Sequence, residues 1–319
     1  MSVRGALRRA AGRSRFVRQS HDTTLAARAA WRAWPKPVLP ADRLLPAWPN
    51  EGPEPTFPNL VSQACTDMQI RSLAYREWVD RLHMPNVQFH RKQWEWFYIA
   101  QALEEAGVIR DGASGIGFGV GTEPLGPWFA SQGCRILATD HPGGEHAESW
   151  SSTGELAHSL ADLNERGVCD QATFEERVRY QPIDMRDLSS IDERFDFAWS
   201  SCAFEHLGSI DAGLRFLEQH LDLLKPGGIG VHTTELNVSS TEETLDHGGT
   251  VLFRRPDLER FAARIADRAD VAPLNFHLGV NPNDRYVAPA HHFSWVVLKY
   301  AFNGHVTTSF GLIVRKKPE

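Results

Sequence analysis

The chain has 319 residues, of which 42% are hydrophobic and 23% charged, a composition typical of a globular protein with one large domain or a domain and an appendage. No apolar run reaches the roughly 18 residues that a membrane-spanning helix needs, so we expect no membrane span. The net charge of −6 combines about +8 over residues 1–36 with about −14 over the rest, and an acidic body argues against nucleic acid as a partner.

Residues 1–59 are predicted to form a basic arm followed by an extended linker. Residues 34–58 hold eight prolines, which block regular helix and favour an extended segment lying over a surface. The Arg- and Ser-containing start also resembles an organellar targeting segment, so its role stays open. The four cysteines lie far apart without a CxxC pair, which indicates reduced thiols in a cytoplasmic protein.

Residues 60–109 are predicted to form a helical prefix of two or three helices. Apolar residues recur there at helical spacing, as in Leu73, Trp78 and Leu82 and again in Trp94, Phe97, Tyr98 and Leu103. An aromatic stripe of this kind is usually buried. The functional alternative is a lid over a bound ligand, with His90 and Arg91 at its edge.

Residues 110–319 alternate between strand-like and helix-like segments. The predicted strands are 114–120, 135–139, 178–183, 195–201 and 229–234, and the predicted helices are 124–131, 155–166, 211–224 and 256–268. Two further strand-like runs, 293–302 and 306–314, meet at Asn303-Gly304, a strong hairpin signal. The pattern predicts an α/β fold: a seven-stranded, mostly parallel sheet with helices on both faces and a C-terminal antiparallel hairpin.

A glycine cluster occupies the first strand-to-helix junction of this region. Gly117, Gly119 and Gly121 allow a sharp turn and close approach to a ligand, which the following helix meets with unpaired N–H groups. Asp140 ends the next predicted strand, about 20 residues further on, where a carboxylate can accept hydrogen bonds from ribose hydroxyls. The arrangement predicts a nucleoside-containing cofactor.

Five segments of residues 110–319, in the correct order, resemble motifs of class I S-adenosylmethionine-dependent methyltransferases, whose fold is Rossmann-like. They are the glycine turn 119–122, the ribose-binding acid Asp140, the adenine-bracketing Ile183-Asp184-Met185, the fourth strand with its turn at 195–207, and the turn 224–228. The resemblance implies S-adenosylmethionine as cofactor. It implies a binding set of Gly117, Gly119, Gly121, Glu123, Asp140, Asp184, Met185 and Ser201.

The glycine turn departs from the family pattern at two positions. Gly117 stands where an acidic residue is often found, and Glu123 stands where the third glycine is usual. Contacts to the methionine part of the cofactor are therefore expected from elsewhere, with Glu123 or the helical prefix as candidates.

The resemblance implies methyl transfer, which requires a positioned nucleophile and, for a hydroxyl, a proton acceptor. His206 is the first candidate base, because it follows the fourth strand and an ordinary histidine titrates near neutrality. His232 and Glu235 would both face the pocket if the fifth strand breaks between them. We expect no metal. The alternative is a divalent ion held by residues from the set Glu205, His206, His232, Glu235 and His291.

A sugar or glycan precursor, or a small-molecule hydroxyl, is the expected acceptor. Residues 117–125 and 250–258 loosely resemble stretches of bacterial glycan and surface-polysaccharide methyltransferases, and the ten tryptophans offer stacking surfaces. One alternative is a non-catalytic, cofactor-binding partner subunit, suggested by the two departures in the turn. Another is an NAD(P)-dependent oxidoreductase, whose GxGxxG motif would need a glycine where Pro124 stands.

Overall fold

The computed structural model describes residues 46–142, 159–289 and 295–318. The predicted basic arm over residues 1–36, the start of the predicted helix 155–166, and His291 lie outside these ranges.

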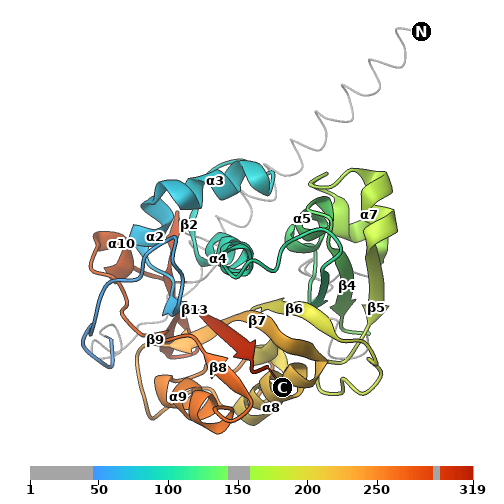
Figure 1. Ribbon diagram of the computed structural model, residues 1–319. Helices are drawn as coiled ribbons and strands as arrows, with labels where there is room; N and C mark the ends of the chain where they lie inside the picture. The colour runs from blue at the N-terminus through green and yellow to red at the C-terminus, as the bar shows by residue number, and fades with distance from the viewer. Residues whose placement is uncertain (1–45, 143–158, 290–294, 319) are drawn as a thin grey trace, which may run out of the picture.

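Seven strands form a continuous central sheet in the order β12-β13-β7-β6-β3-β4-β5. Strands β3 to β7 pair in parallel, whereas β13 is antiparallel to both β7 and β12, so the predicted α/β fold is confirmed. Figure 1 shows β13, β7, β6, β4 and β5 running from the middle of the molecule to its right-hand side. Their bounds are β3 Ser114–Phe118, β4 Arg135–Asp140, β5 Val178–Pro182, β6 Phe195–Ser201, β7 Leu224–Asn237, β12 Lys299–Phe302 and β13 His305–Lys316.

The sheet is larger than the seven strands predicted, because four short strands extend it to eleven. They are β1 Ser62–Ala64, β8 Ala269–Val271, β9 Leu274–Asn275 and β10 Val287–Ala288. Segments of two or three residues carry no readable alternation, so the sequence pattern could not indicate them. A separate two-stranded sheet joins β2 (Phe89–His90) to β11 (Val296–Val297), which divides the predicted strand 293–302.

The C-terminal hairpin forms at the predicted dipeptide. Asn303 and Gly304 both have positive φ, at 45° and 84°, as a two-residue hairpin turn requires. Phe302 and His305 are the first pair of the antiparallel ladder between β12 and β13.

Helices cover both faces of the sheet (Figure 1). Helices α4 (Arg91–Glu105) and α5 (Leu125–Ser131) cover one face, and α8 (Ile210–Leu223) and α9 (Arg255–Arg264) cover the other. The remaining helical segments are short: α2 Asp67–Arg71, α3 Leu73–Arg81, η2 Leu160–Asn164, α7 Gln171–Arg177, η3 Phe204–His206 and α10 Pro282–Arg285. Helix α7 was not predicted, since only Phe174 in it is buried.

The N-terminal prefix is part of the main core. Trp94, Phe97 and Tyr98 of α4 are fully buried and share a hydrophobic cluster with the α5 face of the sheet. A Cβ at Gly311 of β13 would lie 2.1 Å from the Tyr98 ring, so glycine lets the helix approach the strand closely. The helix that carries Arg91 is thereby held against the carboxyl ends of the strands.

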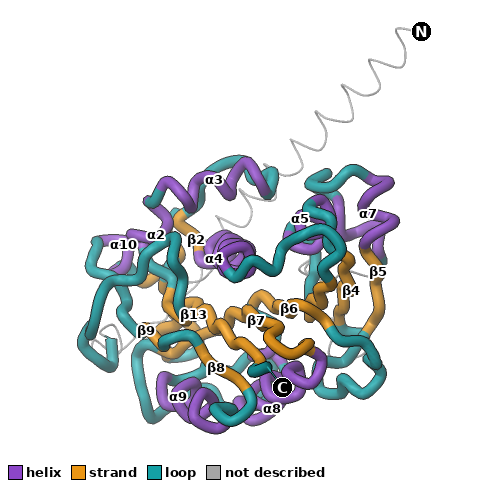
Figure 2. Tube along the Cα trace, in the orientation of Figure 1, coloured by secondary structure: helices purple, strands orange, loops and turns teal. Residues whose placement is uncertain are grey.

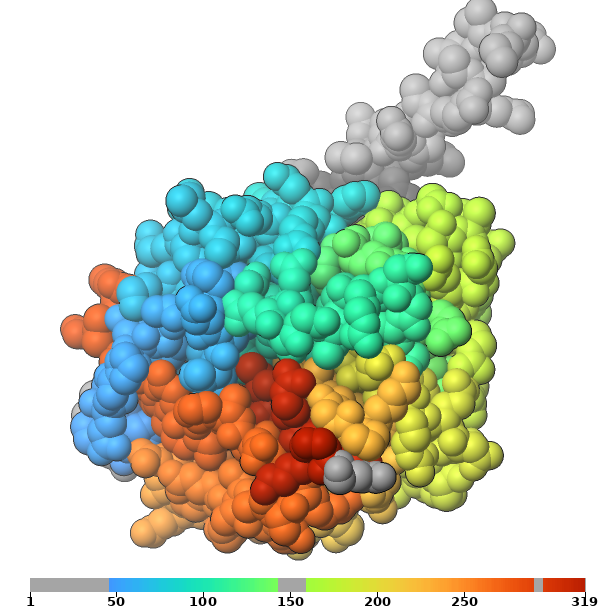
Figure 3. Space-filling view, viewed as in Figure 1, coloured from blue at the N-terminus to red at the C-terminus, as the bar shows by residue number. Residues whose placement is uncertain are grey.

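Residues 46–61 form an extended segment without helix or strand (Figure 2). Trp48 Nε1 donates to the Phe276 carbonyl at 2.9 Å, and Asn50 Nδ2 donates to the Gly279 carbonyl at the same distance. Figure 3 shows this blue segment lying beside orange residues of the C-terminal half. Among the helices of the described ranges, none has the length and apolar character needed to cross a membrane.

Candidate cofactor and acceptor site

The glycine turn is tied to the end of the neighbouring strand β4. Gly119 and Gly121 have positive φ, at 58° and 49°. Val120 N donates to the Thr139 carbonyl at 3.1 Å, and Gly121 N donates to Asp140 Oδ2 at 2.9 Å. The structure therefore brings together the turn and the acid that the sequence singled out, with Asp140 only 4% exposed.

The two departures in the turn meet at Trp199 of β6. A Cβ at Gly117 would lie 2.3 Å from Cζ2 of the Trp199 ring, so the indole fills the space in which a side chain at 117 would stand. Trp199 Nε1 in turn donates to Glu123 Oε1 at 2.6 Å. Burial raises the pKa of Glu123 to about 8.

Asp184 and Met185 follow β5 at the same edge of the sheet. Ile183 N donates to the Asp140 carbonyl at 2.8 Å, which continues the register past the strand end. Asp184 forms an ion pair with Arg186 at 2.6 Å, and hydrogen bonding to Arg186 lowers the pKa of Asp184. Met185 is buried, with its sulfur 3.7 Å from the position of a Cβ on Gly119.

A buried group of charges on α4 lies across from the end of β6. Ser201 Oγ donates to Glu95 Oε2 at 3.1 Å, and Glu95 also pairs with Arg91 Nη1 and Lys92 Nζ, each at 2.8 Å. Burial alone would raise the pKa of Glu95, but Lys92 and Arg91 outweigh it and hold that pKa at about 2.

Sequence reasoning placed Arg91 only at the edge of a possible lid and missed Lys92 and Glu95. A usable signal was present, because Arg91 and Glu95 are spaced i, i+4 beside the apolar stripe that contains Trp94 and Tyr98.

Glu235 of β7 belongs to the same buried group. Its Oε1 lies 2.6 Å from Arg91 Nη2 and accepts from the Tyr300 hydroxyl at 2.9 Å. Its Oε2 accepts from Thr307 Oγ1 at 2.8 Å. The carboxylate is therefore compensated and held by three other elements, α4, β12 and β13.

His232 lies on the opposite face of the sheet from Glu235, so the expectation that both face one pocket is wrong. Strand β7 does not break but continues to Asn237, and residues three apart in a strand point to opposite faces. His232 Nδ1 lies 2.8 Å from Ser200 Oγ, and its ring packs against His220 with centroids 4.6 Å apart. Burial lowers the pKa of His232 well below its ordinary value.

His206 lies in η3, directly after the turn that ends β6. Its Nδ1 is 2.8 Å from the Gly249 carbonyl and 3.2 Å from Thr250 Oγ1. Burial lowers the pKa of His206 to about 4, so the imidazole is neutral at pH 7.

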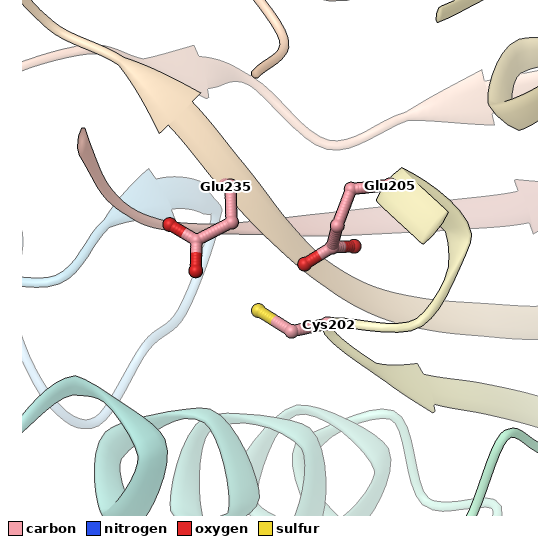
Figure 4. Close-up of side chains that lie close together, drawn as sticks. All are labelled: Cys202, Glu205 and Glu235. Carbon is pink, nitrogen blue, oxygen red and sulfur yellow. The ribbon is translucent and has the colours of Figure 1, made fainter. Parts of the chain in front are cut away.

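The expected alternative metal set is not assembled as a set. His232 points to the opposite face of the sheet, and His291 lies outside the described ranges. Among the described residues, Cys202, Glu205 and Glu235 do converge, with possible ligand atoms within 4.8 Å of one another (Figure 4). Arg91 lies 2.6 Å from Glu235 and its Nη1 lies 3.8 Å from Cys202 Sγ. A guanidinium so close to two of the three side chains disfavours a divalent cation between them.

Residues 116–231, from β3 into β7, match a family model described as a methyltransferase domain. No curated protein matches the chain. Among solved structures, the 1,6-didemethyltoxoflavin-N1-methyltransferase of Burkholderia thailandensis, with bound S-adenosylhomocysteine, is 17% identical to this chain. The match covers 71% of this chain and 78% of that chain, with a TM-score of 0.40. The CcbJ methyltransferase of Streptomyces caelestis is 13% identical over 68% of this chain and 88% of that chain, with a TM-score of 0.39. Residues 116–231 are thus similar to a methyltransferase domain, and the strand order is that of a Rossmann-like, mostly parallel sheet with an antiparallel C-terminal strand.

Proposed function

We propose that the protein is an S-adenosylmethionine-dependent methyltransferase that methylates a hydroxyl group. The observation that carries the proposal is the glycine turn joined to Asp140 by the hydrogen bond from Gly121, within the segment that matches the methyltransferase model. The same match, with the antiparallel β13 in the sheet, favours this function over an NAD(P)-dependent oxidoreductase or a non-catalytic subunit.

The residues around the turn fit the proposed cofactor. At Gly119 a Cβ would lie 2.8 Å from the Ala203 methyl group, so glycine lets the turn pack closely against the loop that follows β6, and its φ of 58° also favours glycine. Asp140 and Asp184 would hydrogen-bond ribose and adenine, and Met185 would contact the adenine ring. Gly117, Gly119, Gly121, Glu123 and Ser201 complete the proposed cofactor-binding set. When bound, S-adenosylmethionine supplies an electrophilic methyl group.

The acceptor would bind between α4 and the carboxyl ends of β6 and β7. His206 is the proposed proton acceptor, because its neutral imidazole can take the proton of a hydroxyl that attacks the methyl group. Glu235, compensated by Arg91, is proposed to orient the acceptor through the hydrogen-bonding groups around it. A catalytic role for His232 remains a sequence-based prediction that its position behind the sheet does not support.

A sugar or glycan precursor remains the proposed acceptor class, with a small-molecule hydroxyl as the other option. The exposed indole of Trp295 could stack on a sugar ring. Within residues 250–258, Val251, Leu252 and Phe253 are buried in the core, so any acceptor contact from this stretch would come from its other residues. The four free, buried cysteines are consistent with the cytoplasmic location we propose.

Calorimetric titration with S-adenosylmethionine, S-adenosylhomocysteine and NAD(H) tests the function. Binding of the first two alone supports a methyltransferase, and binding of NAD(H) alone would replace it with an oxidoreductase. A screen of free sugars, nucleotide sugars and phenols with methyl-labelled S-adenosylmethionine, with and without a chelator, then identifies the acceptor. Cofactor binding without transfer to any of them would favour the non-catalytic subunit.

A further inference from the structure

Glu123 is a buried carboxyl group next to the glycine turn, and it is 6% exposed. It follows Gly121 by two residues and precedes α5, so it belongs to the wall of the proposed cofactor site. Its one hydrogen bond to a side chain comes from Trp199 Nε1, a neutral donor, at 2.6 Å. Within the described ranges, no Lys, Arg or His forms an ion pair with Glu123.

The charged groups around Glu123 already have other partners. Lys92 of α4 pairs with Glu95 at 2.8 Å. Asp140 of β4 accepts from Gly121 N at 2.9 Å and from His141 N at 2.8 Å. Burial raises the pKa of Glu123 to about 8. The hydrogen bond from Trp199 and the charge of Lys92 oppose this rise, whereas the charges of Asp140 and Glu95 add to it. Glu123 is thus a buried carboxyl group beside the turn whose side chain pairs with no cation of the described residues.

We propose that Glu123, positioned by Trp199, binds the ammonium group at the amino-acid end of the cofactor and loses its proton when that ammonium arrives. The inference rests on the proposed function, since it assumes a cofactor with an α-amino group. An ammonium close to a buried carboxyl favours its ionised form. The carboxylic acid becomes a carboxylate, its proton passes to solvent, and the ammonium stays protonated, so charge and atoms balance.

The proposal also explains why both departures in the turn occur together. Gly117 leaves space for the Trp199 ring, and the ring supplies the N–H that orients Glu123. The acid absent at 117 would in effect be replaced by one at 123.

The first test is proton release measured by calorimetry on the full chain. S-adenosylhomocysteine is titrated at pH 7 in buffers of different ionisation enthalpy, and close to one proton should be released per ligand bound. Its affinity should rise by up to about tenfold per pH unit between pH 6 and 7.5 and level off above pH 8, as linkage to one proton requires. 5′-Methylthioadenosine lacks the amino-acid end and should bind without proton release.

The second test uses Glu123→Gln, with Glu193→Gln as the matched control at an exposed ion pair. Glu123→Gln should weaken S-adenosylhomocysteine at pH 8, abolish its proton release and leave 5′-methylthioadenosine affinity unchanged. Trp199→Phe, which removes the N–H donor, should reduce the difference in affinity between S-adenosylhomocysteine and 5′-methylthioadenosine.

If the affinity of the unaltered protein for S-adenosylhomocysteine does not change with pH, the inference is overturned without any variant. Equal proton release with 5′-methylthioadenosine, or in Glu123→Gln, would overturn it as well. If neither nucleoside binds, the proposed function itself is wrong, which is a distinguishable result.

Discussion

Arg91 at the start of α4 and Glu235 near the end of β7 form a buried ion pair, with Nη2 and Oε1 2.6 Å apart. Their side chains are 7% and 4% exposed. The same guanidinium lies 4.7 Å from the centre of the Tyr300 ring. The pair therefore connects the N-terminal prefix to the sheet at the edge where the cofactor turn also lies.

Arg91→Leu is expected to lower the free energy of unfolding by about 3–5 kcal/mol, because it leaves Glu235 as a buried charge without its cation. Denaturant unfolding measures the change. The control is Arg179→Leu, which removes a pair whose side chains are 63% and 54% exposed and should cost less than about 1 kcal/mol. Similar losses in the two variants would contradict a structural role for the Arg91–Glu235 pair.

Gly117→Ala is expected to destabilise the protein by about 1–3 kcal/mol, since the new Cβ would stand 2.3 Å from the Trp199 ring in a packed core. Gly126→Ala is the matched control. Its Cβ would have no neighbour closer than 4.0 Å, and alanine favours helix, so α5 should tolerate or gain from it. Thermal unfolding measures the stability of both variants. A Gly117→Ala variant as stable as the unaltered protein would mean that the indole can move aside.

The positions of the main strands along the chain could be predicted from the sequence because each is an apolar run bounded by turn residues, as Phe195–Ser201 is. By contrast, the sequence could not predict which side chains of β7 point to which face of the sheet. Thr233, Thr234 and Glu235 look like the end of a buried strand, yet they are buried because neighbouring elements supply their hydrogen bonds, as Tyr300 and Thr307 do for Glu235. Partners from β12 and β13, more than 60 residues away in the chain, are not visible in local sequence.

The buried imidazole of His220 is expected to make the protein sensitive to acid. Burial lowers its pKa to about 4, against roughly 6.5 in the unfolded chain, so the unfolded state binds more protons between these values. The free energy of unfolding should thus fall as pH falls from 6.5 toward 4, by about 1.4 kcal/mol per pH unit from this group.

Glu123 and Glu205 act in the opposite direction, since burial raises the pKa of each to about 8. The contribution of His220 is therefore the difference between the unaltered protein and His220→Gln in the slope of the free energy of unfolding against pH. Chemical unfolding between pH 6 and 4.5 measures both slopes. His247→Gln is the control, because that side chain is 77% exposed and should leave the slope unchanged. Parallel curves for His220→Gln and the unaltered protein would show that His220 is not the source.

His206→Ala is expected to leave S-adenosylmethionine affinity unchanged and to lower kcat by roughly 10²-fold, the low end for a positioned general base, because an imidazole with a pKa of about 4 is a weak base. The imidazole is neutral at pH 7 because burial lowers its pKa to about 4, so loss of turnover would reflect loss of a proton acceptor and not of a positive charge. Calorimetry gives the affinity, and labelled methyl transfer to the acceptor found by the screen gives kcat. His277→Ala, at a histidine bonded to Gly279 N near the linker, controls for general damage. Unaltered kcat in His206→Ala would exclude the base role and leave positioning as the source of catalysis.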